Sequence, residues 1–158
     1  MALSVGAEAP DFTLRDQFGQ DVRLSSYRGE KSVLLMFYPW AFSNVCTGEM
    51  QGIRSRLDEF LTFDTEVIGI SIDHVYTLRT FSDEAGINFP LLADFWPHGA
   101  VAQAFGVFDE KIGVARRSSF VIDKHGRITW SVHNELGEGR DLDEQLTQLR
   151  AAVSEPAR

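Results

Sequence analysis

SVLLMFYPWAFSNVCTGE spans residues 32–49 and contains the two features from which the fold can be predicted. Residues 32–38 form a continuous apolar run of strand length. An apolar run that does not alternate with polar residues is typical of a strand covered on both faces. Pro39 has no N–H group to donate to a sheet ladder, so it should end this strand. Ser43 is a good helix N-cap, and apolar residues recur at helical spacing after it. We therefore expect Cys46 in the first turn of a helix.

The rest of the chain alternates short strands and helices. We expect a hairpin at residues 11–14 and 21–24, strands at residues 66–72, 89–93, 106–108, 117–123 and 127–133, and helices at residues 43–61, 76–85, 98–105 and 141–153. This order predicts an α/β fold in which a mixed central sheet carries helices on both faces, with the hairpin at the N-terminus. A thioredoxin-like layout fits the order, although periodicity alone does not single it out.

Length and charge narrow the classes of protein that need to be considered. A chain of 158 residues, 44% hydrophobic and 24% charged, fits one globular domain over residues 1–158. Fifteen Lys and Arg against 23 Asp and Glu give a net charge of −8, the wrong sign for binding nucleic acid. The first ten residues show no signal segment, and the apolar run at residues 33–42 is too short for a bilayer span. We expect a cytoplasmic protein without a membrane partner.

Cys46 is the single cysteine of the chain, so it can form no internal disulfide and no cage of thiolates around zinc. It is either a small buried core residue or a working thiol. The backbone N–H groups and the dipole at a helix N-terminus would favour the thiolate there. The Ser43 hydroxyl, three residues earlier, can either cap the helix or donate a hydrogen bond to the sulfur.

Pro39, Ser43 and Cys46 follow the spacing Pro-x-x-x-Ser-x-x-Cys, which resembles the active-site motif Pro-x-x-x-Thr/Ser-x-x-Cys of peroxiredoxins. The resemblance runs the length of the chain. Residues 6–14 look like the opening segment of the family, and residues 120–123, followed by a glycine turn, look like its late strand. It implies a thioredoxin-like fold and a thiol-dependent peroxidase acting on hydrogen peroxide and organic hydroperoxides.

Residues 94–101 and 106–108 look most like the alkyl hydroperoxide reductase E type, a group of one-cysteine peroxiredoxins known from actinobacteria. A one-cysteine mechanism needs a thiol from outside the chain to reduce the sulfenic acid. The resemblance implies mycothiol with a mycoredoxin as the reductant, with a thioredoxin as the other candidate. It also implies a homodimer, because family members often pair through loops around the active site.

The resemblance assigns roles to five residues. Cys46 matches the peroxidatic nucleophile, Pro39 the proline that shields it from solvent, and Ser43 the hydroxyl that hydrogen-bonds thiolate and peroxide. Serine lacks the methyl group of the more usual threonine, so its hydroxyl is less firmly oriented. Arg117 matches an arginine that lies beside the sulfur and donates to the peroxide oxygens. Glu49 matches an acidic position that helps to orient this arginine.

The residues alone leave other interpretations open. Arg117 could be a solvated charge, and strand alternation means that Arg116 and Arg117 cannot both face one site. The pattern from Ser43 to Cys46 could also belong to a monothiol disulfide oxidoreductase, because it is Cys-x-x-Cys with serine first. A third function is a peroxide sensor in which oxidised Cys46 recruits a partner.

Four further groups of residues are of interest for binding. Asp73, His74 and His98 have no second ligand at metal-binding spacing, and the glycines form no phosphate-cradling pattern, so we expect no metal and no nucleotide cofactor. The acidic residues 135–144, relieved only by Arg140, predict a solvated surface. A set of aromatic residues fits either packing or an apolar approach to Cys46, and its members are Trp40, Phe42, Phe95 and Trp96.

Overall fold

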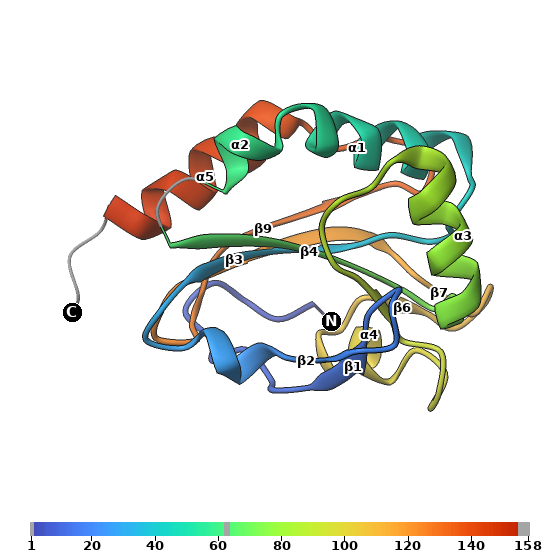
Figure 1. The fold of residues 1–158 in the computed structure, drawn as a ribbon. Helices are drawn as coiled ribbons and strands as arrows, with labels where there is room; N and C mark the ends of the chain where they lie inside the picture. Colours follow the sequence, from blue (N-terminus) through green and yellow to red (C-terminus); the bar gives the residue numbers. More distant parts are fainter. Residues whose placement is uncertain (1, 62–63, 155–158) are drawn as a thin grey trace.

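The computed structural model of the protein describes residues 2–61 and 64–154. Its centre is a five-stranded sheet in the order β5-β4-β3-β8-β9 (Figure 1). The strands are β3 (Ser32–Phe37), β4 (Thr65–Ser71), β5 (Leu91–Ala93), β8 (Arg117–Ile122) and β9 (Ile128–Asn134). Strand β3 is parallel to β4 and antiparallel to β8, and β4 is parallel to β5. The predicted mixed sheet is confirmed, and residues 32–37 form its central strand.

Helices cover both faces of this sheet, as predicted (Figure 1). One face carries α1 (Asn44–Ser55), α2 (Leu57–Phe60), α3 (Val75–Ala85) and α5 (Leu142–Ser154). The other carries α4 (Ala100–Ala104), the 3₁₀ turn η1 (Leu24–Tyr27) and the predicted hairpin, formed by β1 (Thr13–Arg15) and β2 (Asp21–Arg23).

Strand β3 divides the hydrophobic core into two halves. Its alternate side chains point to opposite faces, so Leu34 and Met36 pack under α1 while Leu35 and Phe37 pack toward α4. All six residues of β3 are buried, which explains why the sequence shows a continuous run instead of alternation. Packing on both faces holds β3 in place, and the candidate site begins at the carboxyl end of this strand.

Two predicted elements differ from the structure. The helix predicted over residues 43–61 is interrupted at Arg56, which has φ −119° and ψ 20° and separates α1 from α2. The Arg56 guanidinium binds Glu59 and, across to α5, Asp143 at 2.7 Å.

The strand predicted over residues 106–108 does not join the central sheet. A separate ribbon forms instead from β6 (Phe108–Asp109) and β7 (Val114–Ala115). The turn between them includes Gly113 at φ 70°, a conformation that glycine adopts readily. The chain enters β8 only after this ribbon.

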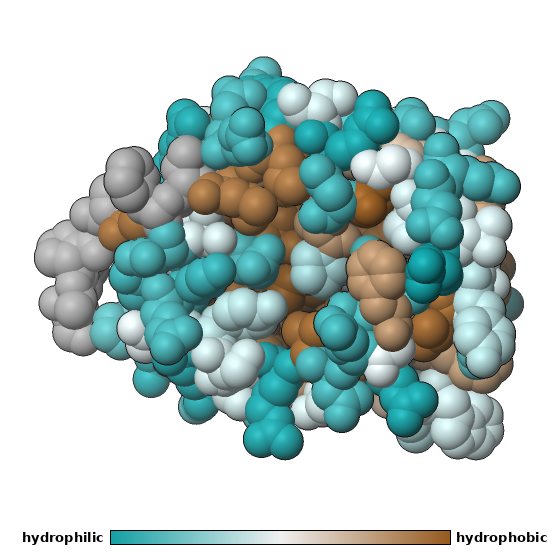
Figure 2. Space-filling view, viewed as in Figure 1, coloured by the Kyte–Doolittle hydropathy of each residue, from teal (hydrophilic) through white to brown (hydrophobic). Residues whose placement is uncertain are grey.

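The helices are too short or too polar to span a membrane in the part of the chain that the structure describes. Hydrophilic side chains predominate on the face seen in Figure 2, with hydrophobic patches in its central and upper-left parts.

Candidate active site

Cys46 lies at the start of α1, the helix that follows the carboxyl end of the central strand β3. The Tyr38 N–H still bonds to the Ile70 carbonyl at 3.0 Å, and the regular ladder ends before Pro39, as predicted. Pro39 is buried, and the Cys46 side chain has no solvent exposure. The thiol therefore sits in the first turn of α1, surrounded by protein.

Ser43 is the N-cap of α1. Its Oγ accepts a hydrogen bond from the Cys46 backbone N–H at 3.3 Å. A hydroxyl can accept and donate at the same time, so the Ser43 proton is still available for a sulfur or a bound oxygen. Capping and donation, which the sequence presents as alternatives, are compatible in this geometry.

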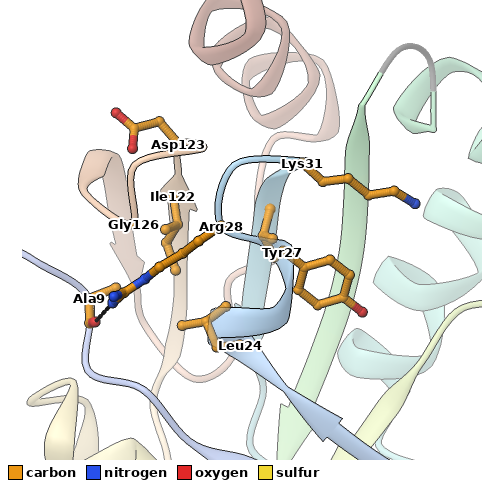
Figure 3. Close-up of a pocket in the computed structure, with 9 residues that line it drawn as sticks. Ala9, Leu24, Tyr27, Arg28, Lys31, Ile122, Asp123 and Gly126 are labelled. Atoms are coloured by element: carbon orange, nitrogen blue, oxygen red, sulfur yellow. Dashed lines mark hydrogen bonds between the residues drawn. The ribbon is translucent and has the colours of Figure 1, made fainter. Parts of the chain in front are cut away.

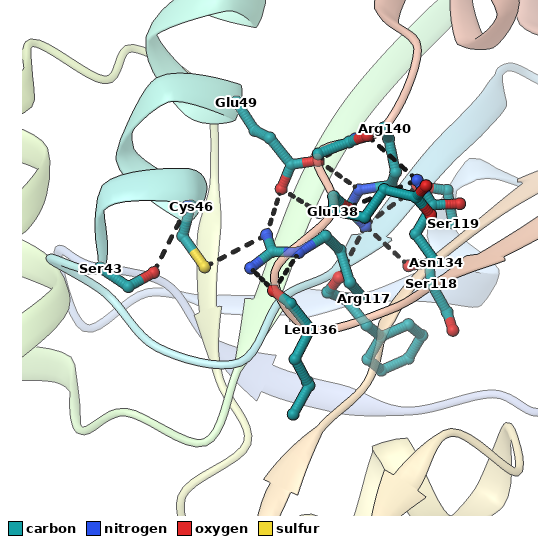
Figure 4. Close-up of polar contacts among 12 residues, drawn as sticks. Ser43, Cys46, Glu49, Arg117, Ser118, Ser119, Asn134, Leu136, Glu138 and Arg140 are labelled. Atoms are coloured by element: carbon teal, nitrogen blue, oxygen red, sulfur yellow. Dashed lines mark hydrogen bonds and ion pairs between the residues drawn. The ribbon is translucent and has the colours of Figure 1, made fainter.

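Arg117 projects from the start of β8 onto the sulfur (Figure 4). Its Nη1 donates to Cys46 Sγ at 3.3 Å, and its Nε and Nη2 donate to the Leu136 carbonyl at 3.0 and 2.7 Å. Arg117 is 1% exposed, whereas Arg116 is exposed, as strand alternation requires. The Leu136 carbonyl thus binds one edge of the guanidinium, and Nη1 lies between the thiol and Glu49.

Glu49 lies one helical turn after Cys46 and joins two arginines. Its Oε1 accepts from Arg117 Nη1 and from Arg140 Nη2, and its Oε2 accepts from Arg140 Nε at 2.8 Å. Burial disfavours the carboxylate charge, but the hydrogen bonds and positive charge of Arg140, with the charge of Arg117, hold the pKa of Glu49 below its ordinary value. Glu49 is therefore ionised within this cluster.

Arg140 was missed by the sequence analysis. The prediction that residues 135–144 form a solvated surface is wrong for this residue, which is 5% exposed. Its Nη1 donates to the Phe37 carbonyl at 2.7 Å and the Ser118 carbonyl at 3.0 Å. The long separation from Glu49 along the chain hides this pairing, and the acidic neighbours make Arg140 look like one more surface charge.

The cluster holds two guanidinium groups and one carboxylate, all buried. Both guanidinium groups share the single carboxylate, so the cluster carries one net positive charge, and Arg117 Nη1 lies beside Cys46 Sγ. A cation and a helix N-terminus beside one sulfur both stabilise negative charge on it. The arrangement is suited to a thiolate that attacks an electrophile.

Comparisons with known proteins agree with this chemistry. The family model described as AhpC/TSA family matches residues 5–131. The chain belongs to this family. It is 50% identical over 139 residues to alkyl hydroperoxide reductase E of Mycobacterium tuberculosis, covering 88% of this chain and 91% of that one. A putative peroxiredoxin of Synechocystis sp. is 40% identical over 159 residues, covering 94% and 78% of the two chains.

Solved structures show the same relationship. The crystal structure of peroxidoxin BcpB from Mycobacterium tuberculosis has a TM-score of 0.84 at 32% identity, covering 94% of this chain and 97% of that one. Mycobacterium tuberculosis AhpC has a TM-score of 0.85 at 25% identity, covering 98% and 95%. The predicted membership of the peroxiredoxins and the predicted thioredoxin-like fold are confirmed.

The other residues considered for binding have different surroundings in this peroxiredoxin. Among residues 2–61 and 64–154 there is no group of three or more His, Cys, Asp or Glu side chains that could hold a metal ion. His98 Nε2 instead lies 2.6 Å from the Gly113 carbonyl. Phe95 and Trp96 line a shallow groove of about 340 Å³ together with residues of the β1–β2 hairpin.

A second, partly open pocket of this peroxiredoxin lies at the amino end of β3 (Figure 3). Its walls include Leu24, Tyr27 and Ile122, and Arg28 Nη2 approaches the Ala9 carbonyl at 3.5 Å. Its free volume is about 10 Å³, room for about one water molecule. It is too small for a substrate, so the cluster around Cys46 remains the candidate site.

Proposed function

We propose that Cys46 is the nucleophile with which this peroxiredoxin, a thiol-dependent peroxidase, reduces hydrogen peroxide and organic hydroperoxides. The observation that supports the proposal most directly is the contact of Arg117 Nη1 with Cys46 Sγ at 3.3 Å in a buried site. A permanent cation beside a thiol at a helix N-terminus favours the reactive thiolate.

These positions support the following reaction. The Cys46 thiolate attacks the terminal peroxide oxygen, an S–O bond forms and the O–O bond breaks. Sulfur is oxidised to a sulfenic acid, and the other oxygen leaves as hydroxide or alkoxide and takes a proton to become water or an alcohol. Arg117 and the Ser43 hydroxyl would donate to the oxygens as charge moves onto the leaving group. Pro39 would exclude water, and Glu49 would hold the Arg117 guanidinium in place.

We further propose a one-cysteine mechanism. Cys46 is the single cysteine of the chain, so an external thiol must displace water from the sulfenic acid to give a mixed disulfide, which a second thiol then reduces. Mycothiol with a mycoredoxin, or a thioredoxin, would supply these thiols. We also expect the chain to act as a homodimer.

Rapid mixing tests the proposal. Reduced protein is mixed with one equivalent of hydrogen peroxide, tryptophan fluorescence is followed in a stopped-flow instrument, and dimedone trapping with mass spectrometry locates the sulfenic acid. Oxidation far faster than that of free cysteine, confined to Cys46 and absent in Cys46→Ala, is the expected result. Oxidation at the rate of a free thiol with both hydrogen peroxide and an organic hydroperoxide would contradict it and favour monothiol disulfide exchange.

A further inference from the structure

The loop at residues 39–43 joins β3 to α1 and carries two of the proposed active-site residues, Pro39 and Ser43. One residue inside it has an unusual backbone. Phe42 has φ 70°, the left-handed region that side chains larger than glycine rarely adopt. Such a conformation persists only where neighbouring groups hold it. A side chain from outside the loop contacts the residue before Phe42.

Asp73 supplies that contact. Its Oδ2 accepts a hydrogen bond from the Ala41 N–H at 2.8 Å. The same oxygen accepts from the Ser71 hydroxyl at 2.7 Å, and Ser71 is fully buried at the end of β4. The carboxylate is thereby held between a rigid strand end and the middle of the loop. Next to it, the Phe42 ring packs edge-on against Phe81 of α3 at a centroid distance of 5.2 Å.

The register of the sheet explains why Asp73 reaches this position. Strands β3 and β4 are parallel, and Phe37 lies opposite Ile70 (Figure 1). The chain segments after Ile70 and after Phe37 therefore leave the same edge of the sheet side by side. The third residue after Ile70 and the fourth residue after Phe37 lie close together there. Asp73 and Ala41 occupy these two positions, so the contact is a direct consequence of the strand pairing.

We infer that Asp73 is a positioning residue for the peroxidase site: by fixing the Ala41 N–H it holds Phe42 in the left-handed region and thereby sets Pro39 and the Ser43 hydroxyl around Cys46. The inference rests on the proposed function of Cys46. Asp73 itself touches neither the sulfur nor the loop hydroxyl, and it acts only through the backbone it holds. When the tie is lost, the loop relaxes and the Ser43 donor loses its alignment with the peroxide oxygens.

Two reactions of Cys46 separate this role from a general effect on folding. Reduction of hydrogen peroxide needs the thiolate and the aligned donors, whereas alkylation by iodoacetamide needs only the thiolate, which displaces iodide. We expect Asp73→Ala to lower the ratio of the peroxide rate constant to the alkylation rate constant at least tenfold, because small misplacements of catalytic groups cost about that much or more. A smaller change in this ratio would overturn the inference.

Conservative and control variants make the comparison sharper. The side-chain carbonyl of Asn can still accept from Ala41 N–H, so Asp73→Asn should restore the ratio to within about threefold of the wild type. An Asn variant as impaired as the Ala variant would attribute the effect to charge and overturn the inference. Asp83→Asn removes an exposed carboxylate from the neighbouring helix α3 and should leave the ratio unchanged.

Hydrogen exchange provides a measurement that needs no variant. The Ala41 amide should exchange slowly in the reduced wild-type protein, and exchange at the rate of a free amide would overturn the inference even if Asp73→Ala does not fold. The two proposals fail differently. A wild-type protein that reacts with peroxide no faster than free cysteine would contradict the function proposed for Cys46, whereas fast wild-type and Asp73→Ala proteins would contradict only the role of Asp73.

Discussion

The two buried arginines have different tasks. Arg140 gives Glu49 two side-chain hydrogen bonds and one from its backbone N–H, and it also donates to a backbone carbonyl of β3 and one of β8. Arg117 shares Glu49 but turns one nitrogen to the Cys46 sulfur. Since Arg140 alone can satisfy the carboxylate, Arg117 is free to respond to charge that develops at the sulfur. This division predicts that replacing Arg117 and replacing Glu49 have different consequences.

Replacing Arg117 should impair chemistry more than folding. We expect Arg117→Gln to lower the rate constant for Cys46 oxidation by hydrogen peroxide about 100- to 1,000-fold, because a preorganised donor at developing charge is lost. Glu49 keeps Arg140 as its partner, so the variant should fold. Stopped-flow fluorescence measures the rate, and Arg116→Gln, the exposed neighbour, is the matched control. Equal rates for the two variants would exclude a role for Arg117 at the sulfur.

Replacing Glu49 should instead impair folding. Glu49→Gln leaves two buried guanidinium groups without a carboxylate, so we expect a loss of about 3–5 kcal/mol in the free energy of unfolding at pH 7. Because the pKa of Glu49 is below its ordinary value in the folded protein, its contribution is complete above the ordinary carboxyl pKa of 4.5 and is lost as the pH falls through the folded value.

Urea unfolding of wild type and Glu49→Gln at pH 7 and at successively lower pH below 4.5 tests this dependence. The difference between the two proteins should shrink in the acid range. Glu84→Gln, which removes an exposed carboxylate from α3, should differ little from wild type throughout. A difference between wild type and Glu49→Gln that stays constant as the pH falls would show that Glu49 is not the ionised partner of the arginines.

At the scale of elements, the start of α1 combines stability and chemistry in one side chain. Ser43→Ala removes the N-cap and should destabilise the protein by about 1 kcal/mol. The same change removes the hydroxyl donor and should slow peroxide reduction about 100-fold. Ser43→Thr keeps both functions and adds a methyl group that restricts χ1, so it should retain stability and at least the wild-type rate.

Thermal unfolding and stopped-flow oxidation of the two Ser43 variants separate these effects. If Ser43→Ala lost stability but reacted with peroxide at the wild-type rate, the hydroxyl would be a helix cap alone.

Local patterns predicted most elements because their signals lie within the elements. The apolar run before Pro39 and the glycine at φ 70° after α3 mark their boundaries directly. The interruption at Arg56 depends on Asp143 of α5, a partner that no local window contains. The strand predicted over residues 106–108 pairs instead across its own turn, because the ribbon of β6 and β7 closes before β8 begins.

The residues of the candidate site also differ in whether the sequence could predict them. Cys46 and Ser43 are close in sequence, so their relationship could be inferred from helical geometry. Arg117 and Glu49 came from the resemblance to a family, and the structure places Arg117 against the sulfur and Glu49 against Arg117. Neither helical geometry nor the resemblance pointed to Arg140. Its burial depends on contacts with β3, β8 and α1 that form only in the folded chain.

At the scale of the whole molecule, the site is assembled from three separate parts of the chain. The first turn of α1 brings Cys46, β8 brings Arg117, and the segment between β9 and α5 brings the Leu136 carbonyl and Arg140 (Figure 4). Each arginine binds backbone carbonyls from another segment, so the arrangement around the sulfur depends on the intact sheet. The fold therefore holds the single thiol of the chain in a buried place.

This enclosure predicts how the oxidised protein behaves. With a single, fully buried cysteine, one equivalent of peroxide should give a chain heavier by one oxygen atom, without covalent dimers. Adding a low-molecular-weight thiol should convert it to a one-to-one mixed disulfide with loss of water, and a redoxin should then release the thiol form of Cys46. Intact-mass spectrometry under denaturing conditions follows each species. Rapid disulfide-linked dimers in the absence of added thiol would show that a second chain supplies the resolving sulfur and would contradict the one-cysteine mechanism.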